Sequence, residues 1–132
     1  MDFLNQIKKY IETNIPVFKT PLSVGALLDG DDIAIVAIPG IQPNKNLDLS
    51  RNYVFPFQIL VRHAKSSISY STCQTIADHL DTLTNGAVTS GDGSFNFVKC
   101  DLYTTPNFVE RTADGDIYTA MFQAELYLLR SE

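Results

Sequence analysis

Positive charge is scarce in this sequence. Lys and Arg together number 10 against 15 Asp and Glu, which leaves a formal net charge of −5. Proteins that bind nucleic acid or anionic membranes do so through clustered cations. The closest group of cations here is Lys8, Lys9 and Lys19, near one end of the chain. We therefore expect no membrane and no sequence-specific nucleic acid among the partners.

Cysteine and long apolar runs are scarce as well. Two cysteines, Cys73 and Cys100, are too few for a disulfide scaffold. No apolar run approaches the roughly 20 residues that a transmembrane helix needs. The first residues form an amphipathic stretch without the basic segment and apolar core of a signal peptide. We expect a soluble protein that is made in a reducing cytoplasm.

The residues that are present suit a folded domain. Of the 132 residues, 45% are hydrophobic and 19% are charged, which is ordinary for a globular protein. A chain of this length buries roughly two-thirds of its unfolded surface. That is enough to fold without metals or disulfides, and we expect a single domain over residues 1–132.

Two segments have the three- and four-residue spacing of apolar side chains that predicts an amphipathic helix. The first covers residues 3–15 and ends before Pro16, which cannot continue a helix. The second covers residues 66–84, with Ser66 or Ser67 as its N-cap. Its predicted buried stripe consists of Cys73, Ile76, Ala77, Leu80 and Leu83.

Apolar side chains in alternation, or in short runs between turn residues, predict strands elsewhere. Residues 22–38 are expected to form a hairpin around a polar turn at 29–32. Residues 53–63 form a third strand, in which Pro56 indicates an edge position or a bulge. Two more strands are expected at residues 94–103 and 117–129. The fold class is therefore α+β, a mixed or mainly antiparallel sheet of about five strands with two main helices packed on it.

The short motifs that could indicate a catalytic, cofactor or metal site are better explained as turns or core residues. Gly91-Asp92-Gly93 opens like a dinucleotide-binding loop, but a strand follows where that loop needs a helix. The acidic turn at 29–32 lacks the spacing of an EF-hand. His63 and His79 fit no zinc pattern, and both cysteines lie on apolar stripes. We predict no catalytic residue, no cofactor and no metal, and expect a protein that is not an enzyme.

Two connections are long for this fold. Residues 39–52 form a polar connection, and residues 104–115 join apolar to charged side chains before an Asp-Gly turn. The side chains of interest in the second are Pro106, Phe108, Val109, Glu110 and Arg111. One interpretation is a loop whose Phe108 packs on its own core. The other is a protruding hairpin that binds another subunit, and the residues leave both open.

Three features follow one another along the chain. A strand ends in Val61-Arg62, a helix follows at once, and Pro106-Asn107-Phe108 precedes Asp114-Gly115 and a long strand over residues 117–129. This order resembles the minor capsid and tail terminator proteins of long-tailed bacteriophages over essentially the whole chain. Asp114-Gly115 departs from the Asp-x-Gly of that pattern, because no residue separates the two.

The resemblance implies a structural virion protein at the head–tail junction, assembled in the cytoplasm of a bacterial host. Proteins of this kind form hexameric rings on the head-proximal end of the tail tube, stop tube polymerisation and offer a docking surface to the head. The implied partners are further copies of the chain, the tail tube protein and a head completion or connector protein. The candidates for subunit or partner contacts are Arg62, Phe108, Glu110 and Arg111.

Two alternatives remain open beside the tail terminator. One is a neck or connector protein on the head side, which has a similar size and composition. The other is a small cytoplasmic α+β binding domain, or an enzyme whose ligand the sequence does not reveal. Oligomeric state and the length of the tails made without the protein distinguish these functions.

Overall fold

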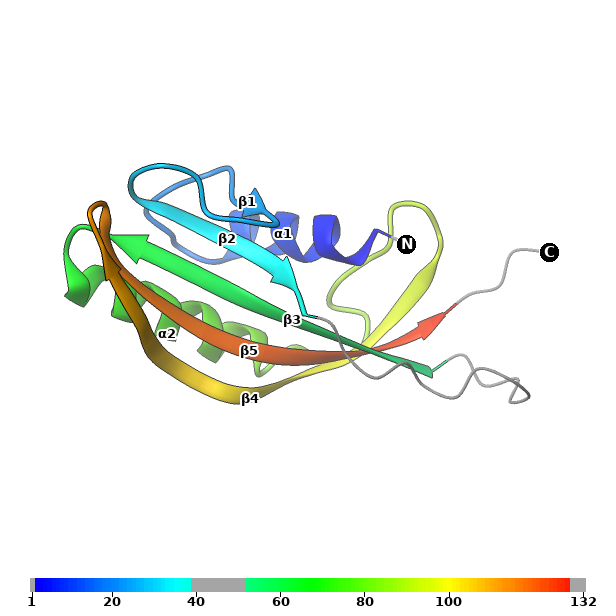
Figure 1. Ribbon diagram of the computed structural model, residues 1–132. Helices are drawn as coiled ribbons and strands as arrows, with labels where there is room; N and C mark the ends of the chain where they lie inside the picture. Colours follow the sequence, from blue (N-terminus) through cyan, green and yellow to red (C-terminus); the bar gives the residue numbers. More distant parts are fainter. Residues whose placement is uncertain (1, 39–51, 129–132) are drawn as a thin grey trace.

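Two helices and five strands make up the part of the chain that the computed structural model describes, residues 2–38 and 52–128 (Figure 1). In chain order they are α1 (Phe3–Asn14), β1 (Ser23–Val24), β2 (Asp32–Ala37), β3 (Asn52–His63), α2 (Ser66–Leu80), β4 (Phe95–Thr112) and β5 (Gly115–Leu128). The predicted connection at 39–52 lies outside the described residues except for Asn52, which begins β3.

The strands form one mixed sheet in the order β1-β2-β3-β5-β4. Three of the pairings are antiparallel, and β1 pairs with β2 in parallel, with Ser23 opposite Ala34. This corrects the hairpin predicted for residues 22–38. The first arm is two residues long, and the chain then turns back over residues 25–31. The Asp32 carboxylate stabilises this connection by accepting hydrogen bonds from the Ser23 hydroxyl at 2.7 Å and the Leu28 N–H at 2.7 Å.

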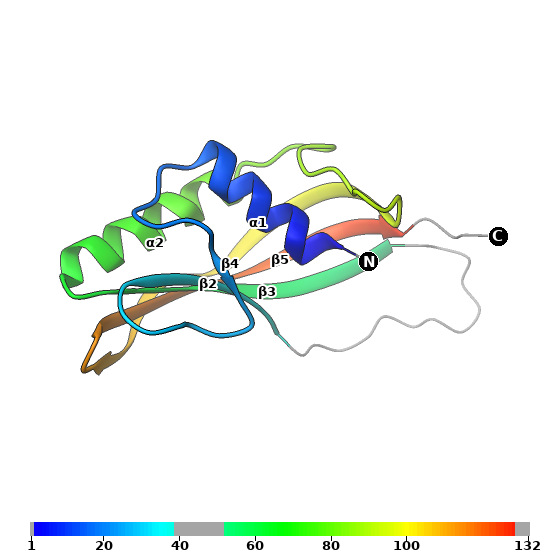
Figure 2. The same cartoon turned by 90° about the horizontal axis from the view of Figure 1, so that it is seen from above.

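Both helices lie on the same face of the sheet (Figure 2). The apolar stripe of α1 is buried at Phe3, Ile7 and Ile11, as the spacing predicts. The stripe of α2 is buried at Cys73, Ile76, Ala77 and Leu80. The helix ends earlier than predicted, at Leu80, and its N-cap is Lys65 without a side-chain hydrogen bond, so the prediction of a serine cap is wrong. The fold is therefore a single α+β domain, as predicted.

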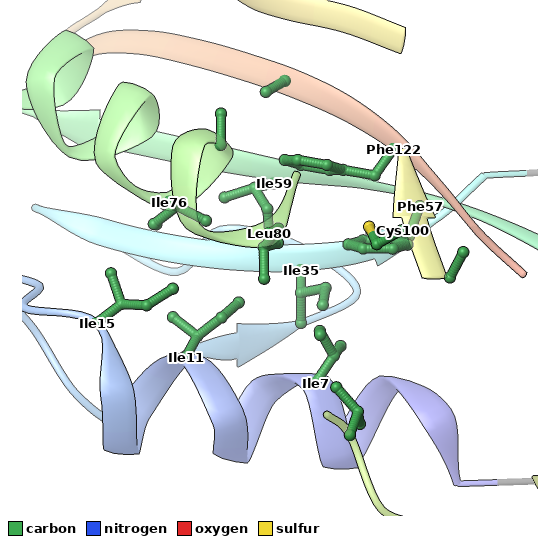
Figure 3. Packing of buried hydrophobic residues seen from close by; sticks show 14 of the residues in the cluster. Ile7, Ile11, Ile15, Ile35, Phe57, Ile59, Ile76, Leu80, Cys100 and Phe122 are labelled. Carbon is green, nitrogen blue, oxygen red and sulfur yellow. The ribbon is translucent and has the colours of Figure 1, made fainter. Parts of the chain in front are cut away.

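The core lies between the helices and alternate residues of the central strands (Figure 3). On β3 these are Phe57 and Ile59, and on β5 the strict alternation of the sequence places Phe122 on the same face, stacked on Phe57 with ring centroids 5.1 Å apart. The cysteines are part of this core: Cys73 and Cys100 are buried and free. Their prediction as small core residues is confirmed.

The predicted connection at 104–115 is the main departure from the expected fold. Strand β4 runs on to Thr112, and a turn of two residues leads directly into β5 at Gly115. β4 has more residues than the stretch of β5 that it pairs with, and four register shifts along β4 accommodate the difference. Two of these shifts directly flank Thr104, one on each side. These β-bulges let a segment that contains Pro106 and lacks strict alternation stay paired with the regular strand β5.

Pro56 lies in a central strand, so the predicted edge position is wrong for β3 as a whole. Pro56 is nevertheless tolerated because it lies where the pairing between β2 and β3 ends. Its carbonyl accepts the N–H of Ile38 at 3.0 Å, one residue beyond the end of β2. The N–H that proline lacks would point to this same side, since both backbone groups of a strand residue face one neighbour. The pairing with β5 therefore loses no donor.

Candidate interaction surface

Three turns meet at one end of the sheet, and hydrogen bonds tie them together. The N–H of Ala64, in the turn between β3 and α2, donates to Asp31 Oδ1 at 2.9 Å. The N–H of Gly30 donates to Asp114 Oδ2 at 3.3 Å across to the β4–β5 turn. Gly115 lies so close to the β3–α2 turn that an added Cβ would be 2.3 Å from the His63 carbonyl oxygen. The end of the β4–β5 hairpin is therefore fixed against the rest of the domain.

Arg62, one of the predicted contact residues, is buried within this end with 8% of its surface exposed. It faces away from the helices, since its neighbour Val61 faces the core. Its Nε donates to the Gly30 carbonyl at 2.8 Å and its Nη2 to the Leu28 carbonyl. The guanidinium holds the 28–32 turn over the sheet, and a role for Arg62 in partner contact stays a prediction without support from its position.

Asp32 is a fully buried carboxylate beside this turn. Besides Ser23 and Leu28, it binds Lys19, whose Nζ lies 2.6 Å from Oδ1. Burial alone would raise the pKa of Asp32. The hydrogen bonds from Lys19, Leu28 and Ser23 together outweigh burial and lower its pKa below the ordinary value. The carboxylate therefore stays charged and anchors the segment that leads from α1 to β2.

Exposed aromatic side chains gather on the helix side of the hairpin, next in sequence to an exposed valine of β4. Phe108 is 50% exposed and meets Tyr118 edge-on, with ring centroids 5.6 Å apart. Tyr118 in turn meets Tyr70 of α2 at 5.5 Å. Val109, 46% exposed, occupies the register shift between Phe108 and Glu110. We call Tyr70, Phe108 and Val109 the hairpin patch. Phe108 lies outside the core, so the interpretation of a loop packed on the core through Phe108 is wrong.

The two charged candidates point to opposite faces of the hairpin. Arg111 pairs across the strands with Asp116, its Nε 2.8 Å from Oδ1, and its side chain is 79% exposed. Hydrogen bonding from Arg111, and to a smaller extent from Ser66, lowers the pKa of Asp116 below its ordinary value. Asp116 and Tyr118 are two residues apart on β5 and therefore share one face of the sheet. Arg111, opposite Asp116, thus lies on the same face as Phe108, opposite Tyr118. Glu110 pairs with Ile117 and lies on the other face, with Arg62.

Other parts of the described chain offer less chemistry. A shallow groove of about 550 Å³ runs past Thr89, Asn96 and Tyr127, and Glu125 is the ionisable side chain that joins Tyr127 in its lining. Burial raises the pKa of both Cys73 and Cys100 to about 12. Within residues 2–38 and 52–128 no group of three or more potential metal ligands occurs, and no helix is long and apolar enough to span a membrane.

No protein-family model matches the chain, and no curated protein matches its sequence. The geometry itself therefore has to indicate the function. It brings Phe108 and Arg111 together and separates them from Arg62 and Glu110. Sequence reasoning named Val109 in the hairpin segment without making it a contact candidate, and it did not foresee that Tyr70 would join the surface. An exposed tyrosine on the outer side of the second predicted helix was the available signal for Tyr70.

Proposed function

We propose that this chain is a structural virion protein of a long-tailed bacteriophage that caps the head-proximal end of the tail tube. In this role, copies of the chain form a ring, end the polymerisation of the tube and present a surface for head joining. The observation that carries the proposal is the hairpin patch. It is an aromatic and apolar surface that the described part of the chain leaves uncovered, at the end of a long hairpin.

The way this hairpin is held supports a role in assembly. Contacts that stop a polymer must keep one geometry, because interfaces lose affinity when segments have to be ordered on binding. Here the bond from Gly30 to Asp114 and the close packing of Gly115 on His63 fix the hairpin end in the single chain. Aromatic residues on such a fixed element are the usual anchors of protein interfaces.

The charge of the chain fits a ring through which DNA passes. A net charge of −5 for each copy adds up in a ring. Phosphate groups are repelled by a surface of the same sign. A ring built from this chain would let DNA through without holding it, whereas a strongly basic lumen in the assembled ring would contradict this part of the proposal.

Deletion of the gene from the phage tests the proposed function. Because the tube then lacks its cap, we expect tails longer than those of the wild type in electron micrographs, with normal length restored by the gene supplied in trans. Tails of normal length beside unjoined heads would instead indicate a head-side connector. Normal phage yield after deletion would contradict a role in the virion altogether.

A further inference from the structure

A second exposed apolar segment leads from the edge strand β1 into the 28–32 turn, which Arg62 holds over the sheet face opposite the helices. Val24 on β1 is 47% exposed, and Leu28 in the turn that follows is 62% exposed, the largest value among the big hydrophobic side chains that the structure describes. The neighbouring carboxylate of Asp29 is exposed and forms no ion pair with the described residues. We call residues 24–29 the β1 segment.

The two surfaces start from strands at opposite edges of one sheet and end on different faces of it, with Leu28 over the face opposite the helices and Phe108 on the helix side. β1 is the first strand in the order β1-β2-β3-β5-β4, and β4, which carries Phe108 and Val109, is the last. Contact between two different surfaces of identical chains is heterologous, and it generates a closed ring when the rotation between copies closes. Two different apolar surfaces on one chain are the arrangement that such a contact requires.

The charges beside the two surfaces are complementary. Arg111 uses its Nε and Nη2 on Asp116, yet its side chain remains 79% exposed. A guanidinium has five N–H donors, so its outer edge can still bind a second carboxylate. Asp29 presents such a carboxylate beside Leu28. Opposite charges at the rim of an apolar contact fix its register and speed association.

The contact is expected to be made by side chains rather than by continuous strand pairing. The register shifts along β4 and the missing N–H of Pro106 interrupt its outer edge. β1 offers two residues of strand. A long intersubunit sheet is therefore poorly supported at either edge, whereas Phe108, Val109 and Leu28 are side chains that can interlock.

From these observations we propose that copies of the chain associate head to tail, with the β1 segment of one copy seated on the hairpin patch of the next and Asp29 paired with Arg111. The proposal rests on the proposed function in one respect, since repetition of this contact would build the ring. The partner that binds the hairpin patch is a second copy of this chain, and neither the tube protein nor the head takes part in the contact.

Cross-linking of introduced cysteines tests the contact. Leu28→Cys and Val109→Cys place one exposed thiol on each surface, and a short bismaleimide then joins thiols that lie close together. The native Cys73 and Cys100 serve as an internal control, because they are buried and their pKa of about 12 keeps them protonated near neutral pH. We expect a covalent dimer from a mixture of the two single variants and a ladder of multimers from the double variant, both for the purified chain and for assembled tails.

A charge reversal tests the polar part of the contact. Asp29→Lys should weaken self-association at least tenfold, measured as the concentration at which oligomers form in light scattering. Asp101→Lys makes the same change of charge at an exposed position of β4 well before Phe108, and it should leave association unchanged. Equal weakening by the two variants would overturn the pairing of Asp29 with Arg111.

The remaining outcomes also decide the proposal. Val109→Cys chains that cross-link to one another would show that the hairpin patch binds its own copy, and absence of any cross-link in both the purified chain and the tails would equally overturn the contact. Tails of regulated length without a ladder would overturn the contact and leave the proposed function standing. A ladder in a chain whose deletion does not alter tails would overturn the function and leave the contact standing.

Discussion

At the scale of single residues, the buried carboxylate of Asp32 makes the clearest prediction. Asp32→Asn removes the charge that Lys19 faces at 2.6 Å and weakens two further hydrogen bonds. Loss of one partner of a buried pair is costly, although Lys19 is partly exposed and regains some hydration. We expect the free energy of unfolding at pH 7 to fall by about 2 kcal/mol. Asp101→Asn, which breaks an exposed pair with Lys99, should cost less than about 0.5 kcal/mol.

The effect of Asp32 should depend on pH in a definite direction. Its pKa in the folded chain lies below the ordinary value of about 3.9. The stability that it contributes is therefore present above pH ~4 and is lost as the pH falls through the folded pKa. Urea unfolding of wild type and Asp32→Asn should show a constant gap from pH 7 to pH ~5 that narrows in more acidic solution. A gap that widened on acidification would contradict this account.

Arg62 shows what alternation along one strand cannot reveal. The pattern of β3 correctly predicts that Arg62 faces away from Val61 and from the core. It does not predict that the 28–32 turn folds over that face and supplies the carbonyls of Leu28 and Gly30. Whether a residue on the polar face is exposed depends on contacts between segments that are distant in sequence. For Phe108 the sequence left open whether it packs on the core or protrudes; it is half-exposed in the structure, and its role as a contact residue stays a prediction.

At the scale of elements, the close packing of the β4–β5 turn on the β3–α2 turn depends on Gly115. Its φ is +136°, and a Cβ would lie 2.3 Å from the His63 carbonyl oxygen. Gly115→Ala should therefore lower the free energy of unfolding by more than about 3 kcal/mol in denaturant titrations. Gly93→Ala is a matched control, because its φ is +75° and nothing lies within 4 Å of the added carbon. It should cost only about 1 kcal/mol. Similar losses in both variants would contradict the packing argument.

Helices and strands were predictable where apolar residues recur with a regular period. They were not predictable where pairing with a neighbouring strand holds an irregular segment in the sheet. The strict alternation of β5 and the stripe of α1 mark these elements correctly. Residues 104–112 read as a connection because Pro106 and the bulges disturb the two-residue period, yet a regular partner strand is enough to hold them in the sheet. The parallel pairing of β1 was hidden for a related reason, because the alternation of side chains does not reveal the bonds by which Asp32 joins Ser23 and Leu28.

At the scale of the whole molecule, folding and assembly should be separable. Phe108→Ser with Val109→Ser removes two half-exposed side chains of the hairpin patch. Since neither is in the core, the free energy of unfolding of the single chain should change by no more than about 1 kcal/mol. Ring formation, measured by light scattering and negative-stain microscopy, should be lost, because the apolar centre of an interface carries most of its affinity.

A matched double variant shows whether this loss is specific to the hairpin end. Val54→Ser with Tyr127→Ser removes side chains that are 46% and 43% exposed at the opposite end of β3 and β5, and it should leave rings intact. Rings that survived the hairpin substitutions, or that failed equally in both double variants, would place the interface elsewhere. A loss confined to the hairpin variant, in a chain that still folds, would show that the sheet end held by Arg62 and Gly115 serves assembly and not only stability.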